Sequence, residues 1–283
     1  MMSFASRSSL FATLLIAALS TQAQQPEAAA EAPASAEGSF EASLLTHYVW
    51  RGQVINDRPV IQKSLTLASS QGFYVGVWAN GDLTDRNRSV EEDEAGNVTG
   101  SYNPEFKCTE FDSYAGFEYA PEDAVFGADV SVTHYSVPQP SSQTDEAAAK
   151  FWLNLPLVQE KIILNPFFSA AYDFSQADGF YFSAGVEAGD IALDNAGRLL
   201  LDLSLSAGYA DADYNTWYFE VNKAAWNDLT AATTLNYACR DWLTFKGTLS
   251  WSTLLNSDIA DGAKTLYWDD QALVAGVGAE LTF

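Results

Sequence analysis

From Phe40 onward, hydrophobic residues alternate with polar residues along the chain with a period of two. In the segment 198–209 (RLLLDLSLSAGY), every leucine except Leu200 lies on one face, while Asp202, Ser204 and Ser206 lie on the other. The segments 241–254 and 272–283 repeat this pattern. Because successive side chains of a β-strand point to opposite faces of its sheet, this period predicts strands rather than helices.

The length and the ends of the predicted strands favour a membrane barrel. A soluble β-sandwich also alternates, so the period alone does not separate the two classes. These strands, however, have about the ten to twelve residues that a tilted strand needs to cross a bilayer, and aromatic residues lie near their ends. The pattern therefore predicts an all-β fold, a transmembrane antiparallel up-and-down β-barrel of about 12 strands. The expected spans are 40–51, 58–68, 71–81, 105–119, 124–135, 147–157, 161–174, 179–189, 198–209, 227–238, 241–254 and 272–283.

The connections predict an orientation. If both chain ends lie in the periplasm, the odd-numbered connections face outward and should be the longer ones. The long connections 82–104, 136–146, 210–226 and 255–271 are all odd, whereas 52–57 and 175–178 are short odd ones and 190–197 is a longer even one. This topology places Cys108 and Cys239 at opposite ends of the barrel, so we expect no disulfide between them.

The first 39 residues differ from the rest of the chain. Arg7, the apolar run 10–19 and the small residues of Thr21-Gln22-Ala23 have the order of a secretory signal peptide, and the run is too short for a membrane anchor. Residues 24–39 are rich in Ala, Pro and Glu, which is typical of a flexible segment. We therefore expect a signal peptide over 1–23, a periplasmic lead-in over 24–39, and a barrel over 40–283 in the bacterial outer membrane.

Several segments resemble a known group of proteins. Among them are 46–52 (THYVWRG), 58–62 (RPVIQ), 72–78 (GFYVGVW) and 110–117 (EFDSYAGF). These segments are similar to the opening hairpins and the acidic strand of the TorF-like family of uncharacterised bacterial outer-membrane barrels. The resemblance is strongest over about residues 44–118. It implies a fold and a location but no activity. The closing Phe283 looks like the terminal aromatic residue by which the barrel-assembly machinery recognises its clients.

Charged residues of the strands predict an acidic lumen. A charge on the lipid face costs about 2–4 kcal/mol at mid-bilayer for Lys or Arg and somewhat less for acids, so these side chains should point inward. A ring of carboxylates would concentrate cations and repel anions. The lumen-lining candidates are Glu41, His47, Arg51, Glu110, Asp112, Tyr114, Glu118, Asp129, Glu187, Asp202, Lys246 and Glu280.

Two functions follow from this lining. The first is a narrow acid-lined pore for passive passage of small cationic or neutral solutes. In the second, Arg51 and Lys246 pair with the acids and close the barrel. The protein would then be structural, or would bind partners through the acidic outer loops 82–104, 210–226 and 255–271. The other expected partners are outer-membrane lipid and lipopolysaccharide.

Other chemistry has little support in the sequence. Asp85, Asn87, Ser89 and Glu91 resemble the start of a calcium loop, but position six is Val90 instead of Gly, and a solvated acidic loop is favoured. The two histidines, His47 and His134, have no evident serine partner and no zinc-ligand spacing with the cysteines. A net charge of −23 opposes nucleic-acid binding. We expect neither an enzyme nor a cofactor.

Overall fold

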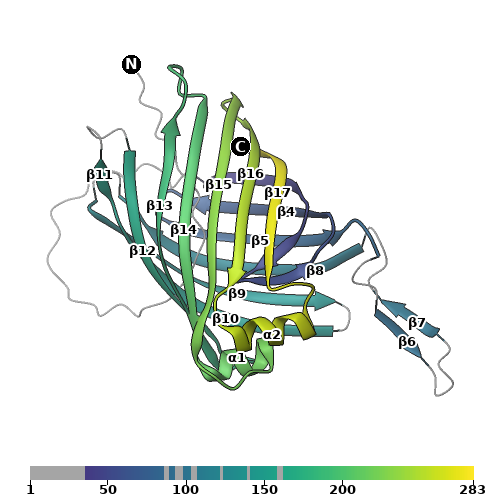
Figure 1. Cartoon of the computed structure of the whole chain (residues 1–283). Helices are drawn as coiled ribbons and strands as arrows, with labels where there is room; N and C mark the ends of the chain where they lie inside the picture. Colours follow the sequence, from purple (N-terminus) through teal and green to yellow (C-terminus); the bar gives the residue numbers. More distant parts are fainter. Residues whose placement is uncertain are drawn as a thin grey trace, which may run out of the picture.

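Twelve long antiparallel strands close into a barrel in the computed structural model, which describes residues 36–85, 89–92, 98–102, 107–121, 124–138, 141–157 and 162–283 (Figure 1). The chain order of the strands is also their order around the wall, and the pairs β1–β17 and β10–β12 complete the circle. The predicted fold is confirmed. The wall strands are β1 (Ala36–Leu45), β4 (Val60–Ser69), β5 (Phe73–Asp82), β8 (Lys107–Tyr119), β9 (Phe126–Pro138), β10 (Ser141–Leu153), β12 (Ile162–Asp173), β13 (Gly179–Ala192), β14 (Leu199–Ala210), β15 (Ala225–Arg240), β16 (Leu243–Leu254) and β17 (Gln271–Thr282).

The remaining elements lie in the connections. The hairpins β2 (Tyr48–Trp50)–β3 (Gln53–Asn56) and β6 (Ser89–Glu92)–β7 (Val98–Tyr102) follow β1 and β5, and β11 (Leu155–Leu157) pairs with the start of β12. Two helices, α1 (Ala212–Phe219) and α2 (Ser257–Leu266), connect β14 to β15 and β16 to β17. Among the described residues, no helix is long and apolar enough to cross a bilayer.

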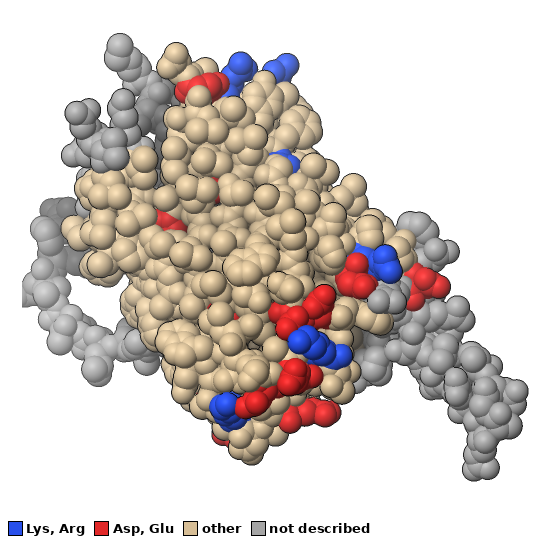
Figure 2. Space-filling model, viewed as in Figure 1, with Lys and Arg blue, Asp and Glu red and all other residues tan. Residues whose placement is uncertain are grey.

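The two faces of the wall follow the period-two pattern. Large hydrophobic side chains are exposed on the outside, as at Leu65, Phe111 and Leu203, while their polar neighbours point into the barrel. In the space-filling view, the visible outer surface is almost free of charge between the two ends of the barrel (Figure 2). An uncharged, hydrophobic outer belt is what a bilayer requires of a spanning barrel.

The two ends of the barrel carry different connections. We call the end from which 46–59, 83–106, 211–224 and 255–270 emerge the loop end. The other end, which holds Ala36 and Thr282, we call the terminal end; its connections are shorter. The odd-numbered connections lie at the loop end, and three of the four that were predicted to be long, 82–104, 210–226 and 255–271, are long in the structure. Both cysteines are free, with Cys108 near the loop end of β8 and Cys239 near the terminal end of β15, as expected from the topology.

Three boundaries differ from those predicted. The first strand covers Ala36–Leu45 instead of 40–51, so the wall starts inside the segment assigned to the lead-in, and Tyr48–Trp50 leave the wall as β2. The expected long loop 136–146 lies mostly within strands, because β9 and β10 extend beyond their apolar alternation and pair up to Pro138 and Ser141. The expected strand 147–157 is correspondingly β10, which ends at Leu153. The signal peptide and the lead-in up to residue 35 lie outside the described residues.

Candidate functional site: the capped mouth of the barrel

Three connections fold over and into the loop end of the barrel. They are the β2–β3 hairpin, α1 and α2, which together we call the cap. Figure 1 shows the two helices at this end of the barrel. The most deeply buried large side chains of the protein include Tyr214, Phe219 and Ile259 of the two helices, which are at most 1% exposed. The two helices lie within 210–226 and 255–271, which the sequence predicted as long outer connections, and their buried side chains pack against the barrel.

Local sequence explains why the two helices begin where they do. Asp211 precedes α1 and accepts a hydrogen bond from the backbone N–H of Tyr214, and Asn256 precedes α2 and accepts from Asp258 and Ile259. Such side chains satisfy the free N–H groups of a first helical turn and are preferred at this position. The helices can therefore form in connections that lack a strand-like alternation.

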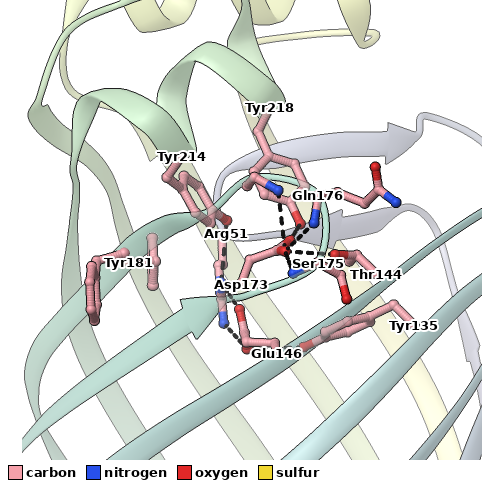
Figure 3. A network of polar contacts seen from close by, with 12 residues as sticks. Arg51, Tyr135, Thr144, Glu146, Asp173, Ser175, Gln176, Tyr181, Tyr214 and Tyr218 are labelled. Carbon is pink, nitrogen blue, oxygen red and sulfur yellow. Dashed lines mark hydrogen bonds and ion pairs between the residues drawn. The ribbon is translucent and has the colours of Figure 1, made fainter.

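The tip of the hairpin places Arg51 inside the barrel. Its guanidinium makes two parallel hydrogen bonds of 2.7 Å to the Glu146 carboxylate of β10, and the two side chains are only 16% and 4% exposed (Figure 3). The same guanidinium donates to the hydroxyl of Tyr214 on α1 at 3.3 Å. Two-pronged bonds between arginine and a carboxylate are among the strongest polar contacts in proteins. One side chain therefore joins the hairpin to the wall and to α1.

Aromatic rings surround this ion pair. The Arg51 guanidinium carbon lies 4.5 Å from the ring centre of Trp50 and 4.3 Å from that of Tyr181 on β13. Trp50 in turn contacts Tyr135 and Tyr218 edge-on, with ring centres 5.7 and 5.4 Å apart. Cation–π contacts gain strength when they are withdrawn from water. Aromatic side chains from the hairpin, from the wall and from α1 therefore surround Arg51 at this end of the interior.

Backbone geometry at the hairpin tip requires a glycine. Gly52 has φ +80, and a Cβ added there would lie 2.6 Å from Leu254 Cδ2 and 2.8 Å from Asp228 Cβ. A positive φ favours glycine, and a side chain at this position would overlap the wall. The turn Arg51-Gly52 can therefore fit against β15 and β16 and direct Arg51 across the lumen.

A second polar centre ties α1 to the wall. Asp173, at the end of β12, accepts from the hydroxyls of Tyr218 (2.9 Å) and Thr144 (2.6 Å) and from backbone N–H groups of residues 175–177 (Figure 3). Burial raises the pKa of the hydroxyls of both Tyr214 and Tyr218. The Tyr218 hydroxyl donates to Asp173, whereas the Tyr214 hydroxyl accepts from Arg51.

Contacts between α1 and α2 complete the cap. Phe219 belongs to the same hydrophobic cluster as Ile259 and Ala263, and its ring lies 6.0 Å from that of Tyr267. The Tyr267 hydroxyl donates to the backbone oxygen of Tyr218 at 2.9 Å. On the barrel side, the amides of Asn215 and Asn227 exchange hydrogen bonds of 2.7 and 3.2 Å while fully buried. The cap is thus continuous from the hairpin to α2.

Most of the predicted lumen residues do face the interior. Glu110, Asp112, Tyr114 and Glu118 alternate with outward residues along β8, and the same alternation directs the other candidates on strands inward, namely Glu41, Asp129, Glu187, Asp202, Lys246 and Glu280. Polar partners hold several of them: Tyr74 donates to Asp129, Asn236 donates to Asp202, and Lys150 pairs with Glu187 at 2.8 Å.

Two candidates were assigned to the wrong element. His47 and Arg51 were predicted to belong to the first wall strand, but both lie in the connection after it. The His47 ring contacts its neighbour Thr46 at 2.9 Å, and Arg51 enters the lumen from the hairpin tip. The prediction was wrong because aromatic and β-branched residues continue past Leu45, and only the Arg51-Gly52 turn shows that Tyr48–Trp50 form a separate short strand.

The terminal end of the lumen has a different centre. Lys246 of β16 lies 2.6 Å from Glu41 of β1 and 2.9 Å from Glu280 of β17, and these three side chains are 20–33% exposed. All three residues were among the lumen-lining candidates predicted from the sequence. Those candidates did not include Glu146, Asp173 and Asp228, which contact the cap. They also did not include the tyrosines that contact Arg51. Glu146 had one available signal, because it shares a strand face with Ala148 and Lys150.

The structure offers no support for a metal site in the residues that it describes. Within the described ranges, no cluster of three or more His, Cys, Asp or Glu side chains has a geometry that could hold a metal ion. Of the weak calcium candidate, Asn87 lies outside the described residues, as do the side chains of Ser89 and Glu91.

The fold places this protein in the class of closed antiparallel β-barrels. The chain belongs to the family of bacterial proteins of unknown function designated Gcw_chp, whose family model matches residues 28–216. No curated protein matches the sequence.

Several solved structures are similar to the chain. The KdgM porin shares 8% identity over 87% of this chain and 99% of its own, with a TM-score of 0.47. LpxR from Salmonella typhimurium shares 8% sequence identity over 87% of this chain and 100% of its own, with a TM-score of 0.48. The outer membrane channel DcaP of Acinetobacter baumannii shares 12% sequence identity over 88% of this chain and 97% of its own, with a TM-score of 0.41. These values are too low to assign a substrate or a mechanism to this chain.

Proposed function

We propose that this protein is an outer-membrane barrel that lets small cationic or neutral solutes pass and that its cap restricts this passage at the loop end. The location rests on the exposed hydrophobic outer belt, which needs lipid around it, and on the TorF-like resemblance of the opening hairpins. The loop end faces the cell exterior in this proposal.

The observation that carries the proposed preference for cations is the charge of the inner face. The basic side chains Arg51, Lys150 and Lys246 are each ion-paired with a glutamate. The inward carboxylates outnumber them; they are Glu41, Asp82, Glu110, Asp112, Glu118, Asp129, Glu146, Asp173, Glu187, Asp202, Asp228 and Glu280. A negative lumen with low-dielectric walls raises the local concentration of cations and lowers that of anions.

A planar-bilayer recording tests the proposal. The full barrel is refolded in detergent and inserted, and single-channel current is measured under a salt gradient. We expect small discrete openings whose reversal potential shows a preference for K⁺ over Cl⁻. The double variant Glu110→Gln with Asp112→Asn should reduce this preference, because it removes two inward carboxylates from β8.

Asp258→Asn with Asp261→Asn is the matched control. It removes the same charge from the exposed surface of α2 and should change the preference much less, because exposed charges are screened by salt. An unchanged selectivity in the β8 variant would refute the acid-lined passage. Absence of current from protein that is shown to be folded and inserted would favour the second function, a closed barrel, which the paired state of Arg51 supports.

A further inference from the structure

The Arg51 guanidinium occupies a site whose walls belong to other parts of the molecule. Glu146 on β10 provides the carboxylate, and Tyr181 on β13 and Tyr214 on α1 provide ring faces 4.3 and 5.8 Å from the guanidinium carbon (Figure 3). Of the close ring contacts, only Trp50 comes from the hairpin itself. If the hairpin moved out, the carboxylate and the two tyrosine rings would remain, and together they are complementary to a flat cation.

Bonds that do not involve Arg51 hold this site in shape. The Tyr181 hydroxyl donates to Asp228 at 2.8 Å, and the Tyr135 hydroxyl donates to Glu146 at 3.3 Å. The Tyr214 backbone is anchored by the Asp211 cap, and its side chain is 1% exposed. A site built in advance loses little conformational entropy when a ligand binds, which favours affinity.

We infer that Glu146, Tyr181 and Tyr214 form a binding site for guanidinium cations, that Arg51 is its internal occupant, and that solutes bearing a guanidinium group compete with the hairpin for it. A guanidinium can make two parallel bonds to a carboxylate while stacking on a ring, which an ammonium group cannot do. The site therefore selects the shape of a cation as well as its charge. The consequence for passage, that such a solute loosens the cap, rests on the proposed function; the binding itself does not.

The test is calorimetric titration of the folded barrel in detergent with methylguanidine. In Arg51→Asn the internal occupant is removed, and asparagine is among the residues that best tolerate the positive φ of 48 at this position. We expect this variant to bind methylguanidine at least about tenfold more tightly than the natural chain and at least about tenfold more tightly than it binds methylammonium.

A second substitution shows whether binding is at this site. Adding Glu146→Gln to Arg51→Asn removes the charge that the cation faces and should abolish the gain. Equal affinity in the natural chain, the single variant and the double variant would overturn the inference, as would equal binding of methylguanidine and methylammonium. If Arg51→Asn does not fold, Arg51→Lys is the variant to titrate, because the lysine ammonium fills the site poorly. Methylguanidine should then bind more tightly to Arg51→Lys than to the natural chain. Equal binding to the two proteins would overturn the inference.

The titration tests the cation site and the bilayer recording tests the passage, so either proposal can be refuted while the other stands. Methylguanidine binding without any current would support the cation site and refute the passage. A cation-selective current without methylguanidine binding in Arg51→Asn would support the passage and refute the cation site.

Discussion

The charged side chains at the two ends of the lumen differ in how they are paired and in how deeply they are buried. At the loop end, Arg51 and Glu146 are almost completely buried, make two 2.7 Å bonds and are surrounded by aromatic rings. At the terminal end, Lys246 lies between Glu41 and Glu280 in a group that is 20–33% exposed and carries one surplus negative charge. A buried pair is costly to break, whereas a hydrated group tolerates the loss of one member. The comparison therefore indicates a strongly held ion pair at one end and a more exposed group of charges at the other.

The largest expected effect is the loss of stability when the carboxylate at the loop end is removed, compared with the same change at the terminal end. Glu146→Gln leaves the Arg51 charge buried without a counter-ion and should destabilise the cap by about 3–5 kcal/mol. Glu280→Gln leaves Lys246 paired with Glu41 and should cost less than about 1 kcal/mol. Amide hydrogen exchange of the hairpin and of α1 measures the first effect, and exchange of β16 and β17 measures the second. Similar losses at the two ends would contradict the comparison.

A smaller effect is expected from the hydrophobic part of the cap. Phe219→Ala empties a position that is 0% exposed between the two helices and should destabilise the cap by about 3 kcal/mol, the lower part of the range for such truncations. The control is Trp217→Ala on the exposed face of the same helix, where 47% of the side chain is accessible. Proteolysis of folded protein at residues 211–224 should accelerate in the first variant only. Equal rates would show that packing does not hold α1 in place.

The bond between α1 and the wall should contribute less. Tyr218→Phe removes the 2.9 Å hydrogen bond to Asp173, which keeps its other donors, and should cost about 1 kcal/mol. Hydrogen exchange of the α1 amides reports this loss. Tyr237→Phe, with a ring that is 41% exposed on the outer face, is the control. An effect as large as that of Glu146→Gln would mean that Asp173, and not Arg51, is the main anchor of the cap.

The smallest effect concerns pH at the terminal end. Backbone N–H groups of Leu199 and Arg198 lower the pKa of Asp194 in the exposed turn 193–198. A carboxyl whose pKa is lowered by folding stabilises the turn above the ordinary aspartate pKa of about 3.9, and this contribution disappears as the pH falls through the folded-state pKa. An NMR titration should find an Asp194 pKa below 3.9 and a turn that loosens on acidification. In Asp194→Asn, the turn should not respond in this range.

Alternation along the sequence was sufficient to predict the wall, because it is a local property. Leu203 and Asp202 take opposite faces whatever the rest of the chain does, and β13–β17 lie within a few residues of their predicted spans. In the structure the same alternation places Glu110, Asp112 and Lys246 on the inner face. It failed at Tyr48–Trp50, where strand-forming residues continue although the chain has already left the wall.

The sequence by itself thus determined that the wall consists of about twelve antiparallel strands with one hydrophobic and one polar face. Only the tertiary structure decided that the connections fold back into the mouth. Arg51 and Glu146 are 95 positions apart and Arg51 and Tyr214 are 163 apart, so no local period relates them. The physical reason is that closing the barrel brings β10, β13 and α1 around one space, and the only cation placed to neutralise Glu146 among the contacts described there is the one on the hairpin tip.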